Sequence, residues 1–98
     1  MSRYIISPSA SRDLEDIIDY LLEQSIDAGE QFLAEFDQKC RNLAQFPNIG
    51  RSYDDLLLGM RGILLKRYII FYRPVNGSIE IVRVISGYRD LPTICEDL

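Results

Sequence analysis

The chain has 98 residues, of which 47% are hydrophobic, so it can bury one modest core and leaves no room for a second. We therefore expect a single domain over residues 1–98. No stretch approaches the roughly 20 apolar residues that span a bilayer, and the first residues lack the pattern of a secretory signal. We expect a cytoplasmic protein without a membrane segment.

The net charge of −4 hides an asymmetry along the chain. Residues 1–50 carry four basic residues against nine acidic ones, a net charge of −5. Residues 56–89 carry six basic residues against Glu80 alone, a net charge of +5. We therefore expect one basic side on a generally acidic protein.

The chain has two cysteines and no histidine. A chain without a secretory signal rarely depends on a single disulfide, so we expect Cys40 and Cys95 to be reduced. Cys40 falls among the apolar positions of a predicted helix and is expected to be a small core residue. We expect no metal and no other cofactor, because two distant thiols without imidazole do not make a zinc site.

The first half of the chain predicts a short strand followed by two helices. Residues 3–6 are aromatic and β-branched, which favours a strand. Ser7 and Pro8 then supply a helix N-cap and a proline at the first helical position. Apolar residues recur at three- and four-residue spacings on both sides of a break at residues 25–27, where Ser25 or Asp27 can cap the second helix. The short break predicts an antiparallel helical hairpin.

The second helix is predicted to end at Phe46, because the proline that follows disfavours helical geometry there. Its apolar positions are Ala28, Phe32, Phe36, Cys40, Leu43 and Ala44. This spacing places them on one side of the helix, so we expect them to face the core.

The second half of the chain predicts a β-meander. Residues 51–59 are irregular, and residues 60–65, 68–73 and 78–86 are typical of strands. Lys66 and Arg67 form the first predicted turn, and the Asn-Gly pair within residues 74–77 favours a tight hairpin. We therefore predict an α+β fold. It has an N-terminal strand, an antiparallel helical hairpin and a three-stranded antiparallel meander that form one small sheet.

Neither face of the predicted middle strand is wholly polar, so both faces of the sheet need a cover. The helical hairpin can cover one face. For the other, we expect either a partner protein or the chain's own C-terminal tail.

Several local motifs follow one another along this framework. Ala10 and the pair Asp13-Leu14 open the first helix, and Leu-Ala-Gln-Phe-Pro-Asn-Ile-Gly-Arg occupies residues 43–51. Gly-Met-Arg at residues 59–61 precedes an aromatic-rich strand, and Ser-Gly-Tyr-Arg-Asp-Leu at residues 86–91 closes the last one. In this order and spacing, over nearly the whole chain, the motifs resemble those of the ParE/RelE toxin superfamily.

The resemblance is stronger to the ParE-like branch, in which Gly59-Met60-Arg61 and Arg89-Asp90-Leu91 are commoner. It implies the toxin of a type II toxin–antitoxin system that binds DNA gyrase and traps its cleaved-DNA intermediate without catalysis of its own. It also implies a cognate ParD-like antitoxin, partly disordered when free, that forms a hetero-oligomer with the toxin. Such an antitoxin places a helix over the helical hairpin and an extended segment near the sheet.

Arginine and tyrosine are enriched among interface hot spots, which selects the candidates for target binding. They are Arg61, Arg83, Tyr88 and Arg89. A purely structural role is also open for some basic residues. Arg61 can tie the irregular segment to the sheet, Arg83 can pair with a helix acid such as Asp16, and Glu80 is then expected to face solvent.

Two alternatives stay open. A ribosome-dependent mRNA endonuclease of the RelE type needs a phosphate clamp and a group that exchanges a proton. The candidates for these roles are Arg61, Lys66, Arg83 and Tyr88, with Glu80 as a second proton carrier. The lack of histidine and the acidity of the chain count against this alternative. The other is a non-toxic relic that only binds an antitoxin, because ParE-like members often carry histidine where Ser86 stands.

Overall fold

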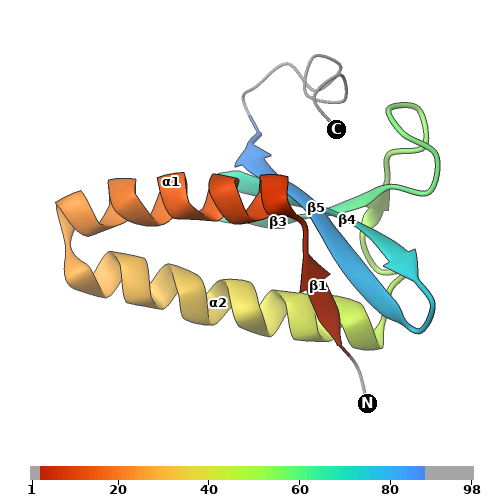
Figure 1. The fold of residues 1–98 in the computed structure, drawn as a ribbon, viewed down its shortest axis with the longest axis horizontal. Helices are drawn as coiled ribbons and strands as arrows, with labels where there is room; N and C mark the ends of the chain where they lie inside the picture. The colour runs from red at the N-terminus through yellow and green to blue at the C-terminus, as the bar shows by residue number, and fades with distance from the viewer. Residues whose placement is uncertain (1–2, 88–98) are drawn as a thin grey trace.

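The computed structural model describes residues 3–87. Two helices, α1 (Pro8–Gln24) and α2 (Ile26–Gln45), run side by side as a hairpin, and their connected end projects beyond the sheet (Figure 1). The five strands are β1 (Tyr4–Ile6), β2 (Arg51–Ser52), β3 (Arg61–Leu65), β4 (Tyr68–Val75) and β5 (Ser78–Ser86). They form one sheet in the order β1-β5-β4-β3-β2. The predicted α+β fold with a helical hairpin and a meander is confirmed.

Both helices begin with a serine cap. Ser7 Oγ accepts a hydrogen bond of 3.0 Å from the Ala10 N–H, and Ser25 Oγ accepts one of 2.9 Å from the Ala28 N–H. Each cap pairs an otherwise unsatisfied donor of the first helical turn. Ser25 alone separates the helices, so the break is shorter than the predicted residues 25–27. The α2 helix ends at Gln45, one residue before the predicted end.

The meander has the predicted strands with small differences at their ends. The β3–β4 turn places Lys66 at a positive φ of 56°. The β4–β5 turn uses Asn76 and Gly77, both at positive φ, which suits an Asn-Gly hairpin. Because this turn needs only two residues, β4 extends through Val75 instead of ending at Arg73.

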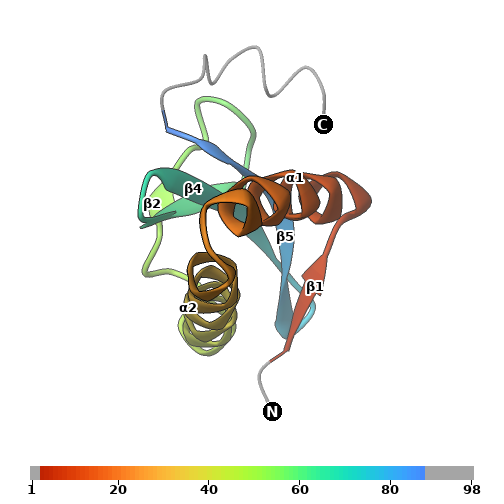
Figure 2. The ribbon, with the colours of Figure 1, turned by 90° about the vertical axis from the view of Figure 1, so that its left-hand side faces the viewer.

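The two outer strands of the sheet are β1 and β2. The sequence predicted neither the partner of β1 nor the existence of β2. Figure 2 shows β1 and β2 on opposite sides of the sheet. The β1 strand pairs with β5 in parallel, and the Ser7 N–H donates to Ile81 O at 3.0 Å just beyond it. The two-residue strand β2 adds to β3 through the pairs Arg51↔Gly62 and Ser52↔Arg61. The sheet is therefore mixed, and it has one more strand than predicted.

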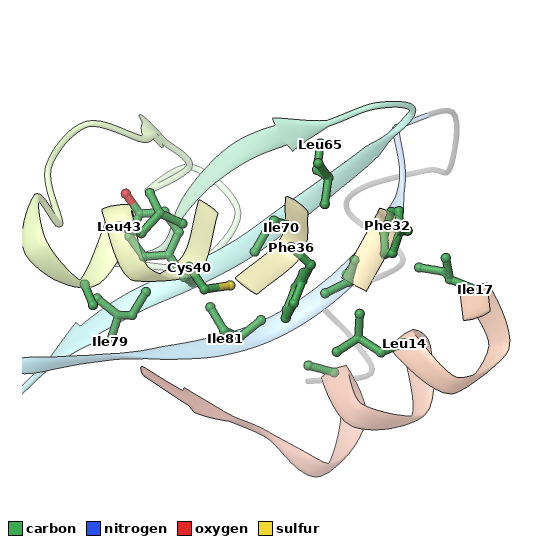
Figure 3. Packing of buried hydrophobic residues seen from close by; sticks show 14 residues of the cluster. Leu14, Ile17, Phe32, Phe36, Cys40, Leu43, Leu65, Ile70, Ile79 and Ile81 are labelled. Carbon is green, nitrogen blue, oxygen red and sulfur yellow. The ribbon is translucent and has the colours of Figure 1, made fainter. Parts of the chain in front are cut away.

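The main core lies between the helical hairpin and the sheet (Figure 3). The predicted core residues Phe32, Phe36 and Cys40 are all buried there. Burial raises the pKa of the Cys40 thiol to about 12, so the group stays protonated and unreactive near neutral pH. Cys95 lies outside the described residues.

A second cluster packs on the opposite face of the sheet. It consists of Met60, Ile69, Phe71 and Ile85, with Tyr53 and Leu56 packed against them. The ring of Tyr53 meets Phe71 edge to face at 5.1 Å between centroids. Part of the face assigned to a partner or to the C-terminal tail is therefore covered by the chain's own segment of residues 53–59.

Neither α1 nor α2 combines the length and the apolar composition of a transmembrane helix, and residues 3–87 contain no other α-helix. Within the same range, no three His, Cys, Asp or Glu side chains gather as a metal site.

Candidate functional site

Arg61 stands at the start of β3 and holds the segment that follows α2. Its Nη1 donates to Gly50 O at 2.7 Å and to Asn48 O at 3.2 Å. Arg61 was predicted to tie the irregular segment of residues 51–59 to the sheet, but the carbonyls that it binds belong to the preceding turn, at Asn48 and Gly50. These acceptors are neutral carbonyls, so the positive charge of the guanidinium is not cancelled by them.

The hydroxyl of Tyr72 forms hydrogen bonds with the same segment. It donates to Pro47 O at 2.6 Å and accepts from the Gly50 N–H at 3.0 Å, and the side chain is fully buried. Burial raises the pKa of Tyr72, and the hydrogen bond from Gly50 partly opposes that rise. A Cβ on residue 50 would lie 2.9 Å from the Tyr72 Cζ, so only glycine fits there.

Replacing Tyr72 by phenylalanine is expected to lower the free energy of unfolding by about 2–4 kcal/mol, because Pro47 O and Gly50 N would lose their buried partner. Urea unfolding followed by circular dichroism measures the change. Tyr68→Phe is the matched control, because the Tyr68 hydroxyl forms no hydrogen bond within residues 3–87. Equal losses in the two variants would contradict the bridging role of Tyr72.

Arg83 on β5 forms a two-point ion pair with Asp13 in α1. Its Nε lies 2.7 Å from Asp13 Oδ2 and its Nη2 3.0 Å from Asp13 Oδ1. The Val84 N–H also donates to Asp13 Oδ2 at 3.0 Å. The two side chains are only 11% and 14% exposed. The predicted pairing of Arg83 with a helix acid is confirmed. The acid is Asp13 and not the suggested Asp16, which is exposed one turn later.

Lys66 and Glu80 lie in separate ion pairs at the surface. Lys66 Nζ is 3.3 Å from Glu35 Oε2 of α2, although the two groups are not aligned for a hydrogen bond. Glu80 is 27% exposed and accepts a 2.8 Å hydrogen bond from Arg73 Nε, so it faces solvent only in part. Such pairs contribute little to stability because water screens them.

The residues proposed for RNA cleavage do not converge. Arg61 begins β3 and Lys66 lies in the turn just after its end, so the two residues are five positions apart, which corresponds to about 16 Å along a strand. Arg83 lies two strands away and is bound to α1. Tyr88 and Arg89 lie outside the described residues. Among residues 3–87, no phosphate clamp is assembled from the predicted set.

Two basic residues that the sequence did not single out, Lys39 and Arg51, line one groove together with Gly62, the neighbour of Arg61. We call Lys39 and Arg51 the basic corner, and neither they nor Arg61 contacts a carboxylate within the described part of the chain. The guanidinium of Arg51 lies 5.2 Å from the centroid of the Tyr53 ring, which is a cation–π contact. Lys39 was overlooked because it belongs to the acidic half of the sequence.

The far end of the helical hairpin carries exposed apolar side chains. Leu22, Ile26 and Leu33, which we call the hairpin patch, are 44%, 68% and 46% exposed. Gly29 brings the helices close together here, since a Cβ at this position would lie 2.8 Å from Leu22 Cδ2. The patch therefore combines exposed apolar side chains of both α1 and α2 at this end of the hairpin.

Comparison with known proteins identifies the family. The family model of the ParE toxin of type II toxin–antitoxin systems, parDE, matches residues 4–91. This chain belongs to the ParE toxin family. The resemblance to the ParE-like branch is thus confirmed.

Curated relatives of this ParE-family chain agree over nearly its whole length. "Toxin ParE1" of Mycobacterium tuberculosis (strain CDC 1551 / Oshkosh) is 35% identical over 92 residues, which are 92% of this chain and 94% of the relative. "Toxin ParE1" of Caulobacter vibrioides (strain ATCC 19089 / CIP 103742 / CB 15) is 28% identical over 86 residues, 87% of this chain and 88% of the relative.

A solved structure shares the ParE-family fold. The "Chromosomal ParDE TA system from P. aeruginosa" superposes with a TM-score of 0.71 at 20% identity. The match covers 88% of this chain and 96% of the solved one. At this identity the likeness shows the fold alone.

Proposed function

We propose that this chain is the toxin of a two-component pair, is neutralised by a cognate ParD-like antitoxin, and inhibits DNA gyrase without catalysis of its own. The observation that carries the proposal is the family match over residues 4–91. The scattered positions of Arg61, Lys66 and Arg83 support a binding protein over a nuclease, because a cleavage site needs its charges on one phosphate.

The hairpin patch supports an antitoxin partner of defined chemistry. Its apolar side chains lie among the acidic residues Glu23, Asp27 and Glu30, all exposed. A partner helix with an apolar stripe and flanking Lys or Arg residues is complementary to this surface. Burial of the hairpin patch would stabilise the complex, and the flanking charges would orient the partner helix.

Target binding is assigned to four residues. They are Arg61, Arg83, Tyr88 and Arg89. Of these, Arg61 contacts no carboxylate within residues 3–87, which favours it as a contact of the target. Arg83 offers a target only the small exposed part of its side chain. We propose that the chain inhibits gyrase in the cytoplasm, where gyrase and its DNA are found. A single domain over residues 1–98 is proposed to carry this function.

Pulse-labelling of DNA and protein synthesis, shortly after the chain is induced without its antitoxin, tests the proposal. We expect growth arrest in which DNA synthesis falls first, and co-expression of the antitoxin should prevent it. Purified gyrase should then accumulate cleaved plasmid in the presence of the chain.

The other outcomes assign the alternatives. If protein synthesis stops first, the chain is a nuclease of the RelE type, and Lys66, Arg61 and Tyr88 become catalytic candidates. If neither synthesis falls while the antitoxin still binds, the chain is a non-toxic relic.

A further inference from the structure

The loop of residues 53–59, between β2 and β3, is closed by hydrogen bonds of its own backbone. The Tyr53 N–H donates to Met60 O at 2.8 Å, which joins the two ends of the loop. Inside the loop, the N–H groups of Leu56 and Leu57 donate to Tyr53 O at 2.9 and 3.1 Å. The Met60 N–H donates to Leu57 O at 3.0 Å. These bonds give the loop a defined backbone conformation.

Two further features hold this loop in place. The Gly59 N–H donates to Asp54 Oδ1 at 2.8 Å across the loop. Gly59 has a positive φ of 83°, a conformation that glycine adopts without strain. The side chains of Tyr53 and Leu56 pack on the second cluster, on the face of the sheet away from the helices. The loop is therefore both closed by hydrogen bonds and anchored to the sheet.

The tip of the loop carries two exposed leucines. Leu57 and Leu58 are 36% and 85% exposed, and no other large apolar side chain among residues 3–87 is as exposed as Leu58. Leu58 contributes little to the stability of the fold, because its side chain remains in water. A preformed loop also loses little conformational entropy when it binds. The tip is therefore suited to bind another molecule.

Charge decides which kind of molecule the tip can bind. Residues 52–60 contain Asp54 and Asp55, both exposed, and no Lys or Arg. The nearest cations lie at the base of the loop, where Arg51 stacks on an aromatic ring and Arg61 binds backbone carbonyls. Carboxylates beside the tip repel phosphates, so DNA and an anionic membrane are disfavoured. The complementary surface is an apolar pocket of a protein with Lys or Arg at its border.

The loop and the hairpin patch lie at opposite ends of the molecule. In Figure 1 the loop, in green, is on the right, and the connected end of the hairpin is on the left. A partner helix on the hairpin patch would therefore be remote from the tip of the loop. The tip remains available for a different protein.

We infer that this chain contacts its target protein through the loop of residues 53–59, with Leu57 and Leu58 in an apolar pocket and Asp55 beside a basic residue at the border of that pocket. The inference rests on the proposed function, because it takes gyrase as the target. It adds an apolar, preformed contact to the arginine and tyrosine candidates. Asp54 is a positioning residue, since its carboxylate binds Gly59 and holds the tip in shape.

Cleavage of plasmid DNA by purified gyrase, titrated with the chain, tests the inference. Leu58→Ser should raise the concentration for half-maximal cleavage at least about tenfold, as expected for loss of an interface hot spot. Its thermal melt by circular dichroism and its affinity for the antitoxin should stay unchanged, because Leu58 is exposed and remote from the hairpin patch. Leu64→Ser is the matched control. Leu64 is a 63% exposed leucine on β3, outside the loop, so this variant should poison gyrase like the unmodified chain.

The outcomes separate the inference from the proposed function. Equal potency of Leu58→Ser and the unmodified chain would overturn the inference and leave the proposed function standing. Unchanged potency together with weakened antitoxin binding would also overturn it and assign the loop to the antitoxin. If the unmodified chain produces no cleaved plasmid, the proposed function and the inference both fail.

A second pair of variants tests the need for a preformed loop in the same titration. Asp54→Ala removes the acceptor of the Gly59 N–H, so the potency should fall about fivefold. Asp54→Asn keeps an oxygen acceptor and should stay within about twofold of the unmodified chain. Equal potencies of the alanine and asparagine variants would contradict the positioning role of Asp54.

Discussion

Asp13→Ala should lower the free energy of unfolding by about 3–5 kcal/mol, because it leaves the guanidinium of Arg83 nearly buried without its counter-charge. The substitution also removes the acceptor of the Val84 N–H. The lost ion pair and the lost hydrogen bond both connect the first turns of α1 to β5. Urea denaturation followed by circular dichroism measures the change.

Asp16→Ala is the control, because Asp16 is exposed on the same helix and forms no salt bridge or side-chain hydrogen bond within residues 3–87. Its effect should stay within about 0.5 kcal/mol, as for an ordinary surface substitution. If Asp16→Ala were as costly as Asp13→Ala, the assignment of the ion pair would be wrong. The pair also limits the interpretation of Arg83 variants, since loss of toxicity in them must be separated from unfolding.

Phe32→Ala should also destabilise the fold by about 3–5 kcal/mol, because it empties a fully packed position of the main core. Phe32 is 1% exposed, and its ring meets Tyr68 edge to face at 5.6 Å between centroids. Thermal melting by circular dichroism should show a large decrease in the melting temperature.

The neighbouring variant Leu33→Ala is expected to behave in the opposite way. Leu33 belongs to the hairpin patch, so its loss should leave melting nearly unchanged and weaken binding of the antitoxin. Unchanged melting of Phe32→Ala together with lost antitoxin binding would instead assign Phe32 to the interface.

Local signals in the sequence were sufficient for most of the elements. Ser7 and Pro8 marked the start of α1, the spacing of Phe32, Phe36 and Cys40 marked the core side of α2, and Asn76-Gly77 marked the last turn. Each of these is decided by neighbours within a few positions, either through a cap, a helical period or a turn geometry. A short stretch of sequence is therefore enough to predict such an element.

The pairings between distant segments were not predictable in the same way. Residues 3–6 predict a strand but contain nothing that selects β5 as its parallel partner. The two residues of β2 are too few to show an alternating pattern. Asp13 and Asp16 are one helical turn apart, so the choice between them for Arg83 depends on where β5 crosses α1.

The candidate site shows the same limit. A role for Arg61 in holding a neighbouring segment was predicted, but the segment was not, because Arg61 binds the carbonyls of Asn48 and Gly50 and not residues 51–59. The basic corner was not, since Lys39 and Arg51 come from α2 and β2 and line one groove only in the folded chain. Tyr88 and Arg89 lie beyond the described residues, so their assignment remains a prediction for the gyrase experiments.

The parallel pairing of β1 with β5 determines when the sheet can be completed during synthesis of the chain. Ser7 donates to Ile81 O and Val82 O, so the first strand finds its partner only after more than seventy further residues have been synthesised. Contacts of such long sequence separation slow folding, because the chain loses loop entropy before it gains them. A nascent chain on the ribosome therefore has no complete sheet until its last strand emerges. An antitoxin that is already present can therefore bind the toxin as soon as its sheet is complete.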